Sequence, residues 1–340
     1  MKRTILTTLA ATALLAIPAC PGGSSASSEK LIPEQATAML GVDVANLFKS
    51  KLYVDNKALV DSNSQFKDVV EAAKGCEFDP EKNMRSVLYG TDMKSGHAVV
   101  VTGEGLGDEK ILTCIADKLK DKNGGKVPFT VSEESGKKVV KADNNEFTGY
   151  IVDGRTLVFA STPWTGAVKD LIDDKGKSAV DGPHKDLFAR ADRSKHIWAA
   201  GVAPEDLASL AKSNQNVDVK DISGSIDLSD GVAVQATATL ASPEQAAEVK
   251  TKVDQALPGA KAILSLMQVP TTIVDNVKLE AKDAQLSVEA KITAADLKAL
   301  QEKAGSMPGG LPFGGGGGDA LPIEPSIPAD PPPAEDAPAE

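Results

Sequence analysis

SVLYGTDMKSGHAVVVTGEGLGDEKI (residues 86–111) and DISGSIDLSDGVAVQATATLASPEQA (residues 221–246) repeat one pattern at a constant offset of 135 positions. Each stretch is typical of a strand, a tight turn that ends in glycine, a second strand and then a helix. The turns DMKSG and DLSDG contain the Asp and Gly residues that hairpin geometry favours. The pattern therefore predicts a hairpin followed by a helix at two places in the fold. The identical positions are Asp92 and Asp227, Gly96 and Gly231, Ala98 and Ala233, Val99 and Val234, Thr102 and Thr237, and Glu109 and Glu244.

The flanking sequence continues in the same way. Apolar runs between residues 128 and 161 predict further hairpin strands, and a long helix from Pro243 leads to a strand pair that ends near Ile292. Because the strands arrive in hairpins with helices between the pairs, we predict an α+β fold of antiparallel-rich sheet with helices on one face. We divide it into two repeated units, residues 37–180 and 181–304.

Composition limits the class of protein. The chain has 340 residues, enough for two domains, and 41% of them are apolar, enough for a sizeable core. The formal net charge of −11 repels nucleic-acid phosphates, so we expect no nucleic-acid partner. Residues 305–340 are rich in Gly, Pro and acids, which predicts a disordered tail. A solubilising tail is the simpler interpretation, and an interaction tail is the alternative.

The first twenty residues are typical of an export signal. Met1-Lys2-Arg3 is positively charged, and Thr4 to Ile17 is apolar but shorter than the roughly 20 residues that span a bilayer. Ile17-Pro18-Ala19-Cys20 then matches the bacterial lipobox, in which a small residue precedes a cysteine that is lipidated, although Pro18 departs from the commoner Ala, Ser or Thr. The alternative is an ordinary signal peptide with Cys20 as a plain residue. Because bulky Ile17 fits an A-x-A cleavage site poorly, we favour the lipobox.

A lipobox predicts where in the cell the protein is located. Residues 1–19 would be removed, acyl chains on Cys20 would hold the protein on a membrane, and residues 20–36 would form a flexible tether. Loss of the two positive side chains changes the net charge from −11 to −13. We therefore expect a lipid-anchored protein of the cell envelope that faces the periplasm. Pro21 stands where Asp would retain it at the inner membrane, which favours the outer membrane.

Cys76 and Cys114 remain once Cys20 is set aside. Cys76 follows a predicted helix at the stop signal Gly75, and Cys114 lies inside a predicted helix that starts at Glu109. An even pair in an exported chain predicts a disulfide, worth about 4 kcal/mol through loop-closure entropy. Two free buried thiols are the alternative. The spacing is unlike C-x-x-C, so we expect no redox-active role.

Glycine-rich and acidic turns give weak signals for binding sites. The stretch from Gly103 to Gly107 lies where a phosphate-binding loop would, but its third glycine comes one position early and Glu104 would repel a phosphate. Asp227 to Gly231 is faintly similar to a calcium loop but lacks the distal Glu. We interpret both as turns and expect no cofactor.

Histidines and tryptophans give no stronger signal. His97, His184 and His196 have no second ligand three or four residues away, so we expect no metal site. No nucleophile elbow is present, and we assign no catalytic residue. Trp164 and Trp198 are candidates to line an apolar pocket, although core packing is the more frequent role of such residues.

The lipobox, the segment Gly75-Cys76-Glu77-Phe78-Asp79-Pro80 and Cys114 together resemble a group of lipid-anchored bacterial envelope proteins that have no assigned activity. Members have a short tether, duplicated α+β units and a cysteine pair in the first unit. The resemblance covers residues 1 to about 304 and implies no catalytic residue in this chain.

Two roles remain open for the folded part. We expect a non-enzymatic protein with a structural or protein-interaction role, for which another envelope protein is the candidate partner. The alternative is a binding module for an apolar or lipid ligand, in a cavity lined by Val, Leu and Ala between sheet and helices.

Overall fold

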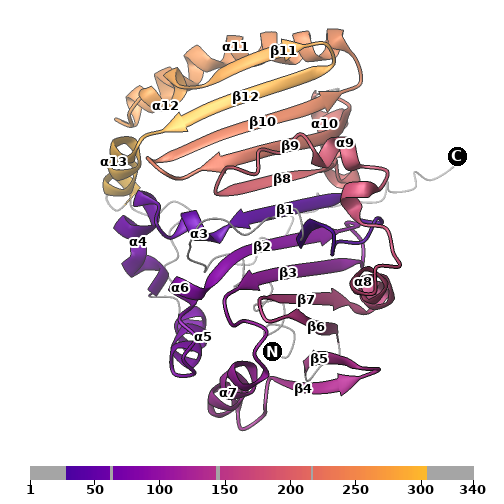
Figure 1. Cartoon of the computed structure of the whole chain (residues 1–340). Coiled ribbons are helices and arrows are strands. Elements are labelled where there is room, and N and C mark those ends of the chain that lie inside the picture. The colour runs from indigo at the N-terminus through magenta and orange to yellow at the C-terminus, as the bar shows by residue number, and fades with distance from the viewer. Residues whose placement is uncertain (1–27, 62–63, 143–145, 216, 305–340) are drawn as a thin grey trace, which may run out of the picture. The chain divides into compact units, whose positions relative to one another are not determined.

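The computed structural model describes residues 28–61, 64–142, 146–215 and 217–304 (Figure 1). The predicted signal peptide, Cys20 and the predicted tail from residue 305 lie outside these ranges. Residues up to Leu300 belong to one compact unit, and a second unit, Gln301–Glu340, begins in the last turn of the final described helix.

The first unit contains a 12-stranded sheet in the order β11-β12-β10-β9-β8-β1-β2-β3-β7-β6-β5-β4, in which every neighbouring pair is antiparallel. This confirms the predicted α+β class with antiparallel sheet. The strands are β1 Ala38–Asp43, β2 Met84–Thr91, β3 His97–Gly103, β4 Phe129–Glu134, β5 Lys137–Ala142, β6 Phe147–Asp153, β7 Thr156–Ser161, β8 Ile197–Val202, β9 Val219–Asp227, β10 Val232–Leu240, β11 Lys278–Lys282 and β12 Gln285–Ile292.

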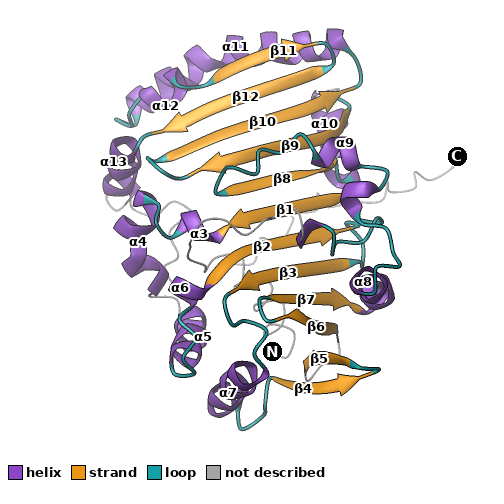
Figure 2. Ribbon diagram, viewed as in Figure 1, coloured by secondary structure: helices purple, strands orange, loops and turns teal. Residues whose placement is uncertain are grey.

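Helices surround this sheet, with α4, α12 and α13 near one end of the strands and α8, α9 and α10 near the other (Figure 2). α11 runs along the edge strand β11. The helices are α3 Val44–Leu47, α4 Lys51–Asp61, α5 Ser64–Lys74, α6 Pro80–Asn83, α7 Glu109–Lys120, α8 Thr165–Ile172, α9 Lys185–Phe188, α10 Glu205–Gln215, α11 Pro243–Leu266, α12 Thr272–Asp275 and α13 Ala294–Ala304.

Both predicted hairpins with a following helix are present, as β2–β3 with α7 and as β9–β10 with α11. Each turn is held by its predicted aspartate. The Asp92 carboxylate accepts from the backbone N–H groups of Lys94 and Gly96, and the Asp227 carboxylate accepts from that of Ser229. The acidic residue closes each turn as an Asx-type cap, which is why this residue type recurs in both copies.

Side chains alternate between two faces of the sheet, and residues paired across neighbouring strands lie on the same face. The registers place Val99, Leu40, Ala199 and Ala236 on one face. We call this the apolar face and the other side the opposite face.

Strands β3 and β7 have buried residues on both faces, and β1 and β2 do so over part of their length, where Leu40 and Tyr89 are only half-buried. Val99 and Val101 of β3 pack against α5 and α7 on the apolar face, whereas Ala98 and Val100 pack against α8 and α9 on the opposite face. The expectation of helices on one face only is therefore wrong for this part of the sheet. The physical reason is the unbroken apolar run from Ala98 to Val101, which is the pattern of a strand covered on both sides.

In strands β9, β10 and β12, side chains alternate between a mostly apolar face and a mostly polar face. Ile222, Val234 and Val288 lie on the apolar face, while Ser223 and Gln235 lie on the opposite face. Polar side chains thus predominate on one side of this part of the sheet and apolar side chains on the other, although Ser223 and Ser225 on the polar side are themselves buried.

The predicted boundaries need two corrections. Ile32 and Ala36 are fully buried in the core on the opposite face, and the Glu29 carboxylate accepts from Nε and Nη2 of Arg193 at 2.6 and 2.9 Å. The predicted tether, residues 20–36, is therefore too long, because the folded part has begun by Ser28. In addition, β1 pairs with both β2 and β8, so one sheet runs through both predicted units; their duplication stays a prediction.

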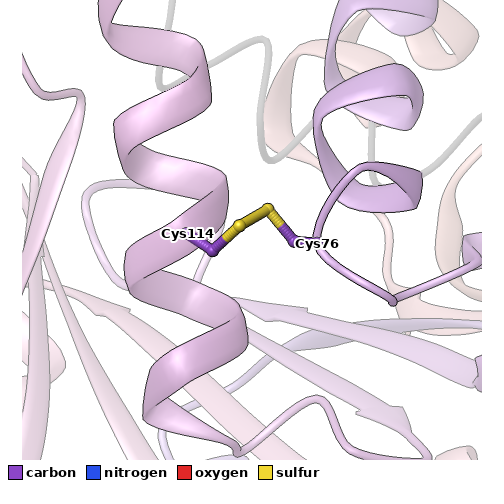
Figure 3. Close-up of a disulfide and its surroundings, with 2 residues drawn as sticks. All are labelled: Cys76 and Cys114. Atoms are coloured by element: carbon purple, nitrogen blue, oxygen red, sulfur yellow. A yellow bond between two sulfur atoms is a disulfide. The ribbon is translucent and has the colours of Figure 1, made fainter.

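The predicted disulfide between Cys76 and Cys114 is confirmed (Figure 3). It joins the turn after α5 to the middle of α7, with the two Cα atoms 5.8 Å apart and a sequence separation of 38. Both helices cover the apolar face, so the crosslink ties this cover together.

We expect the Cys76→Ala/Cys114→Ala double variant to lose about 4 kcal/mol of unfolding free energy, because the unfolded chain regains the entropy of an open loop. Urea unfolding followed by tryptophan fluorescence measures this loss. Reduction of the native protein should reproduce it, and an unchanged transition midpoint in both cases would contradict the prediction.

Candidate functional site: a half-covered apolar sheet face

A continuous row of apolar side chains crosses the sheet on the apolar face. Direct pairings join each residue of this row to the next strand, without a charged side chain among them. The middle of the row, Ala199, Gly224 and Ala236, has the smallest side chains, and we call these three residues the floor. Larger side chains lie at both ends of it. From β2 to β12 the row is Tyr89, Leu40, Ala199, Gly224, Ala236 and Val288.

Burial along this face decreases from β3 and β7 toward the second half of the sheet, and Tyr89 and Leu40 between them are already half-buried. Val87, Val99, Val101 and Leu157 are at most 7% exposed beneath the helices of the first half. On β8, β9, β10 and β12 the corresponding residues are only half-buried, apart from the end residues Leu240 and Leu286. The same apolar face is therefore closed on one side and half-covered on the other.

The position of α11 explains this incomplete cover. Its described contacts are with the edge strand β11 and with the ends of β10 and β12, where Ala246 packs on Leu240 and Leu286. Val253 and Leu257 farther along this helix are only half-buried, and Ile263 and Leu266 near its end are exposed. The helix thus lies over the edge of the sheet and leaves the floor at β8, β9 and β10 partly open.

Two polar side chains meet at one end of this floor. Tyr89 Oη and His97 Nδ1 are 2.7 Å apart, on the apolar faces of β2 and β3. Burial raises the pKa of Tyr89, so its phenol keeps its proton over the physiological range. On β1, β8, β9, β10 and β12 the residues paired on this face are apolar, which makes the Tyr89–His97 pair a polar end to an apolar strip.

The exposed end of α11 is a separate apolar feature. Ile263, Leu266 and Met267 are 58%, 84% and 42% exposed and lie within one helical turn. They follow Pro258, which removes a backbone donor inside the helix. Single exposed apolar residues are ordinary, but three adjacent ones form a patch of the kind found at contact surfaces.

The stretch from Gly103 to Gly107 is predicted to be a turn without a bound phosphate. The packing around it shows why glycine is needed at these positions. A Cβ on Gly103 would lie 2.8 Å from the Asn83 carbonyl oxygen, and one on Gly107 would lie 1.9 Å from that of Asp153. Gly105 has a φ of 76°. The Glu104 carboxylate accepts from Arg85 and Arg155, at 3.3 and 3.1 Å. Close backbone approach and this ion pair account for the loop without a phosphate.

The three histidines have different surroundings. His97 meets Tyr89, His184 packs near Phe188, and His196 Nδ1 accepts from the backbone N–H of Leu228. Among the described residues, no group of three or more His, Cys, Asp or Glu side chains has the arrangement of a metal site. In the calcium-like turn, hydrogen bonds from Ser229 and Lys195 lower the pKa of Asp227, so its carboxylate already has partners.

Both tryptophans belong to the core of the opposite face. Trp198 lies against Gly41, where a Cβ would come within 2.3 Å of its ring, and Arg193 stacks at 4.7 Å from the ring centroid. Trp164 packs against Gly96 in the same core. Neither residue lines the half-covered floor, so the core-packing interpretation is confirmed.

Comparison with known proteins adds little to this geometry. No protein-family model matches the sequence, and no curated protein matches it. Among solved structures, crystal form I of TP0453 is similar with a TM-score of 0.42 and 10% sequence identity, over 81% of this chain and 96% of that chain. Within the described residues, no helix is long and apolar enough to cross a bilayer.

We expect Ala236→Leu to change the unfolding free energy by less than about 1 kcal/mol, because the half-covered floor beside Gly224 has room for the larger side chain. The matched variant Ala160→Leu, at a fully buried position, should cost about 1–3 kcal/mol through overpacking. Urea unfolding of both variants measures the difference. Equal losses would mean that the floor is as tightly closed as the core.

Proposed function

We propose that this chain is a lipid-anchored, non-catalytic protein of the bacterial cell envelope, held on a membrane through Cys20 and facing the periplasm. The lipobox supports the anchor, and the disulfide between Cys76 and Cys114 is consistent with an oxidising compartment. Pro21 favours the outer membrane. No catalytic residue, cofactor or metal is assigned.

The tether to the membrane is short. Eight residue steps separate Cys20 from Ser28, where the described chain begins, and eight fully extended residues reach at most about 29 Å. Such a link would keep the folded part close to the lipid surface and raise its effective concentration there.

Of the two roles that the sequence leaves open, binding of an apolar ligand has the stronger support. The observation that carries it is the contrast in burial on one continuous sheet face, closed by helices over β3 and half-covered over β8, β9 and β10. An uncovered apolar floor costs free energy in water, and an apolar ligand would recover it.

A protein-contact role rests on a different feature, the exposed end of α11. Ile263, Leu266 and Met267 give it an apolar surface, and another envelope protein is the partner that the sequence suggests.

We expect Cys20→Ala to abolish incorporation of a fatty-acid analogue and to move the protein from the membrane fraction to the soluble fraction of cells. The thiol of Cys20 is the only attachment point that the lipobox offers. Metabolic labelling and fractionation of wild type and variant measure this, with the Cys76→Ala/Cys114→Ala variant as the control that keeps its label. An unlabelled wild type would refute the anchor.

We expect Ala236→Trp to weaken binding of the uncharged apolar dye Nile red by at least about tenfold, because the indole fills the floor that the dye occupies. Fluorescence titration of the purified folded part measures the affinity.

The matched control for this titration is Gln235→Trp. It adds the same ring to the same strand, but on the opposite face. It should leave the affinity unchanged. Absence of saturable binding to wild type, or equal weakening by both variants, would overturn the ligand-binding role.

A further inference from the structure

The apolar floor has a polar end, and this asymmetry narrows the class of ligand. Tyr89 lies directly opposite Leu40, which lies opposite Ala199, so the phenol stands at the head of the small-residue strip. A plain hydrocarbon would leave the remaining hydrogen-bonding capacity of the Tyr89–His97 pair unused. A molecule with one polar head and one apolar chain would match both parts.

We propose, resting on the ligand-binding role above, that the ligand is a fatty acid whose carboxyl group hydrogen-bonds the Tyr89–His97 pair and whose chain crosses β1, β8 and β9. One hydrogen of the pair is used in the bond between Tyr89 Oη and His97 Nδ1, and the pair keeps a second for a carboxyl oxygen: the imidazole Nε2–H when the phenol donates, or the phenol O–H when Nδ1 donates. Both side chains are half-buried, so the ligand can reach them.

The length of the strip fits such a chain. Neighbouring strands are about 4.8 Å apart, so the four steps from β2 to β10 span about 19 Å. One leaflet of a bilayer is about 15 Å of hydrocarbon, half of the roughly 30 Å core, which sets the length of a common acyl chain. A chain of this length that starts at Tyr89 crosses about three strand steps and ends near Gly224 on β9, within the roughly 19 Å that the strip offers.

The side chains along the strip also fit a narrow occupant. Ala199, Gly224 and Ala236 are the smallest residues of the row, and they lie on three successive strands. Leu40 and Val288 lie at the two ends of this low stretch, four strand steps apart. An extended acyl chain can follow such a shallow path from strand to strand.

The test compares two competitors of similar length, lauric acid and dodecane, for displacement of Nile red. With the wild type we expect lauric acid to compete better than dodecane. In Tyr89→Phe the affinity for lauric acid should fall about 3- to 10-fold, the effect of one lost hydrogen bond, while that for dodecane stays unchanged. His97→Phe, which keeps a ring but removes both nitrogens, should have the same effect.

Tyr150→Phe is the matched control, because Tyr150 lies in the core of the opposite face and donates to the Thr165 carbonyl oxygen at 3.5 Å. It should change neither affinity. Equal competition by acid and hydrocarbon in wild type, or equal loss of both in Tyr89→Phe, would overturn the head-group assignment while leaving ligand binding intact. Failure of Nile red to bind at all would instead overturn the ligand-binding role.

Discussion

The alternation of side chains along antiparallel strands is the constraint on which the rest of this structure depends. Paired strands must place their apolar side chains on the same face of the sheet. A register slip of one residue would move every side chain of a strand to the other face. The row from Tyr89 to Val288 meets this condition with residues from both halves of the chain. The register shift in β10, between Thr239 and Leu240, lies at the end of the strand, so it leaves the row in register.

How much of this continuous apolar face is buried depends on the helices that pack on it. The first half supplies α5 and α7, crosslinked by Cys76 and Cys114 and packed on β3. The second half supplies α11, which lies on β11. That strand has only five residues and presents Lys278 and Lys282, both features that protect a sheet edge from unwanted pairing. Because α11 lies along β11 and reaches only the ends of β10 and β12, the strip on β8, β9 and β10 stays half-covered.

Local patterns in the sequence predicted local structure well. The hairpins at Asp92 and Asp227, the helices after them and the pairing of Cys76 with Cys114 all follow from turn chemistry, periodicity and cysteine count. Long-range choices were not predictable in this way. Nothing near Ala38 indicates that β1 will pair with both β2 and β8, and the alternation from Ile222 to Leu240 marks an apolar face without showing what covers it. The pairing of Tyr89 with His97 follows only from the register of β2 and β3.

The polar end of the strip matters because of where a ligand would come from. A fatty acid leaving water gains about 0.8 kcal/mol for each methylene that it buries, but one leaving a bilayer gains almost nothing, since lipid tails are as apolar as the floor at Ala199 and Ala236. With the proposed anchor at Cys20, which would keep the folded part within about 29 Å of a membrane, apolar area alone would not draw a ligand out of the lipid. Hydrogen bonds from Tyr89 and His97 in a half-buried setting are stronger than the same bonds at a hydrated membrane surface. Selectivity at this site would thus depend on two side chains rather than on the size of the apolar face.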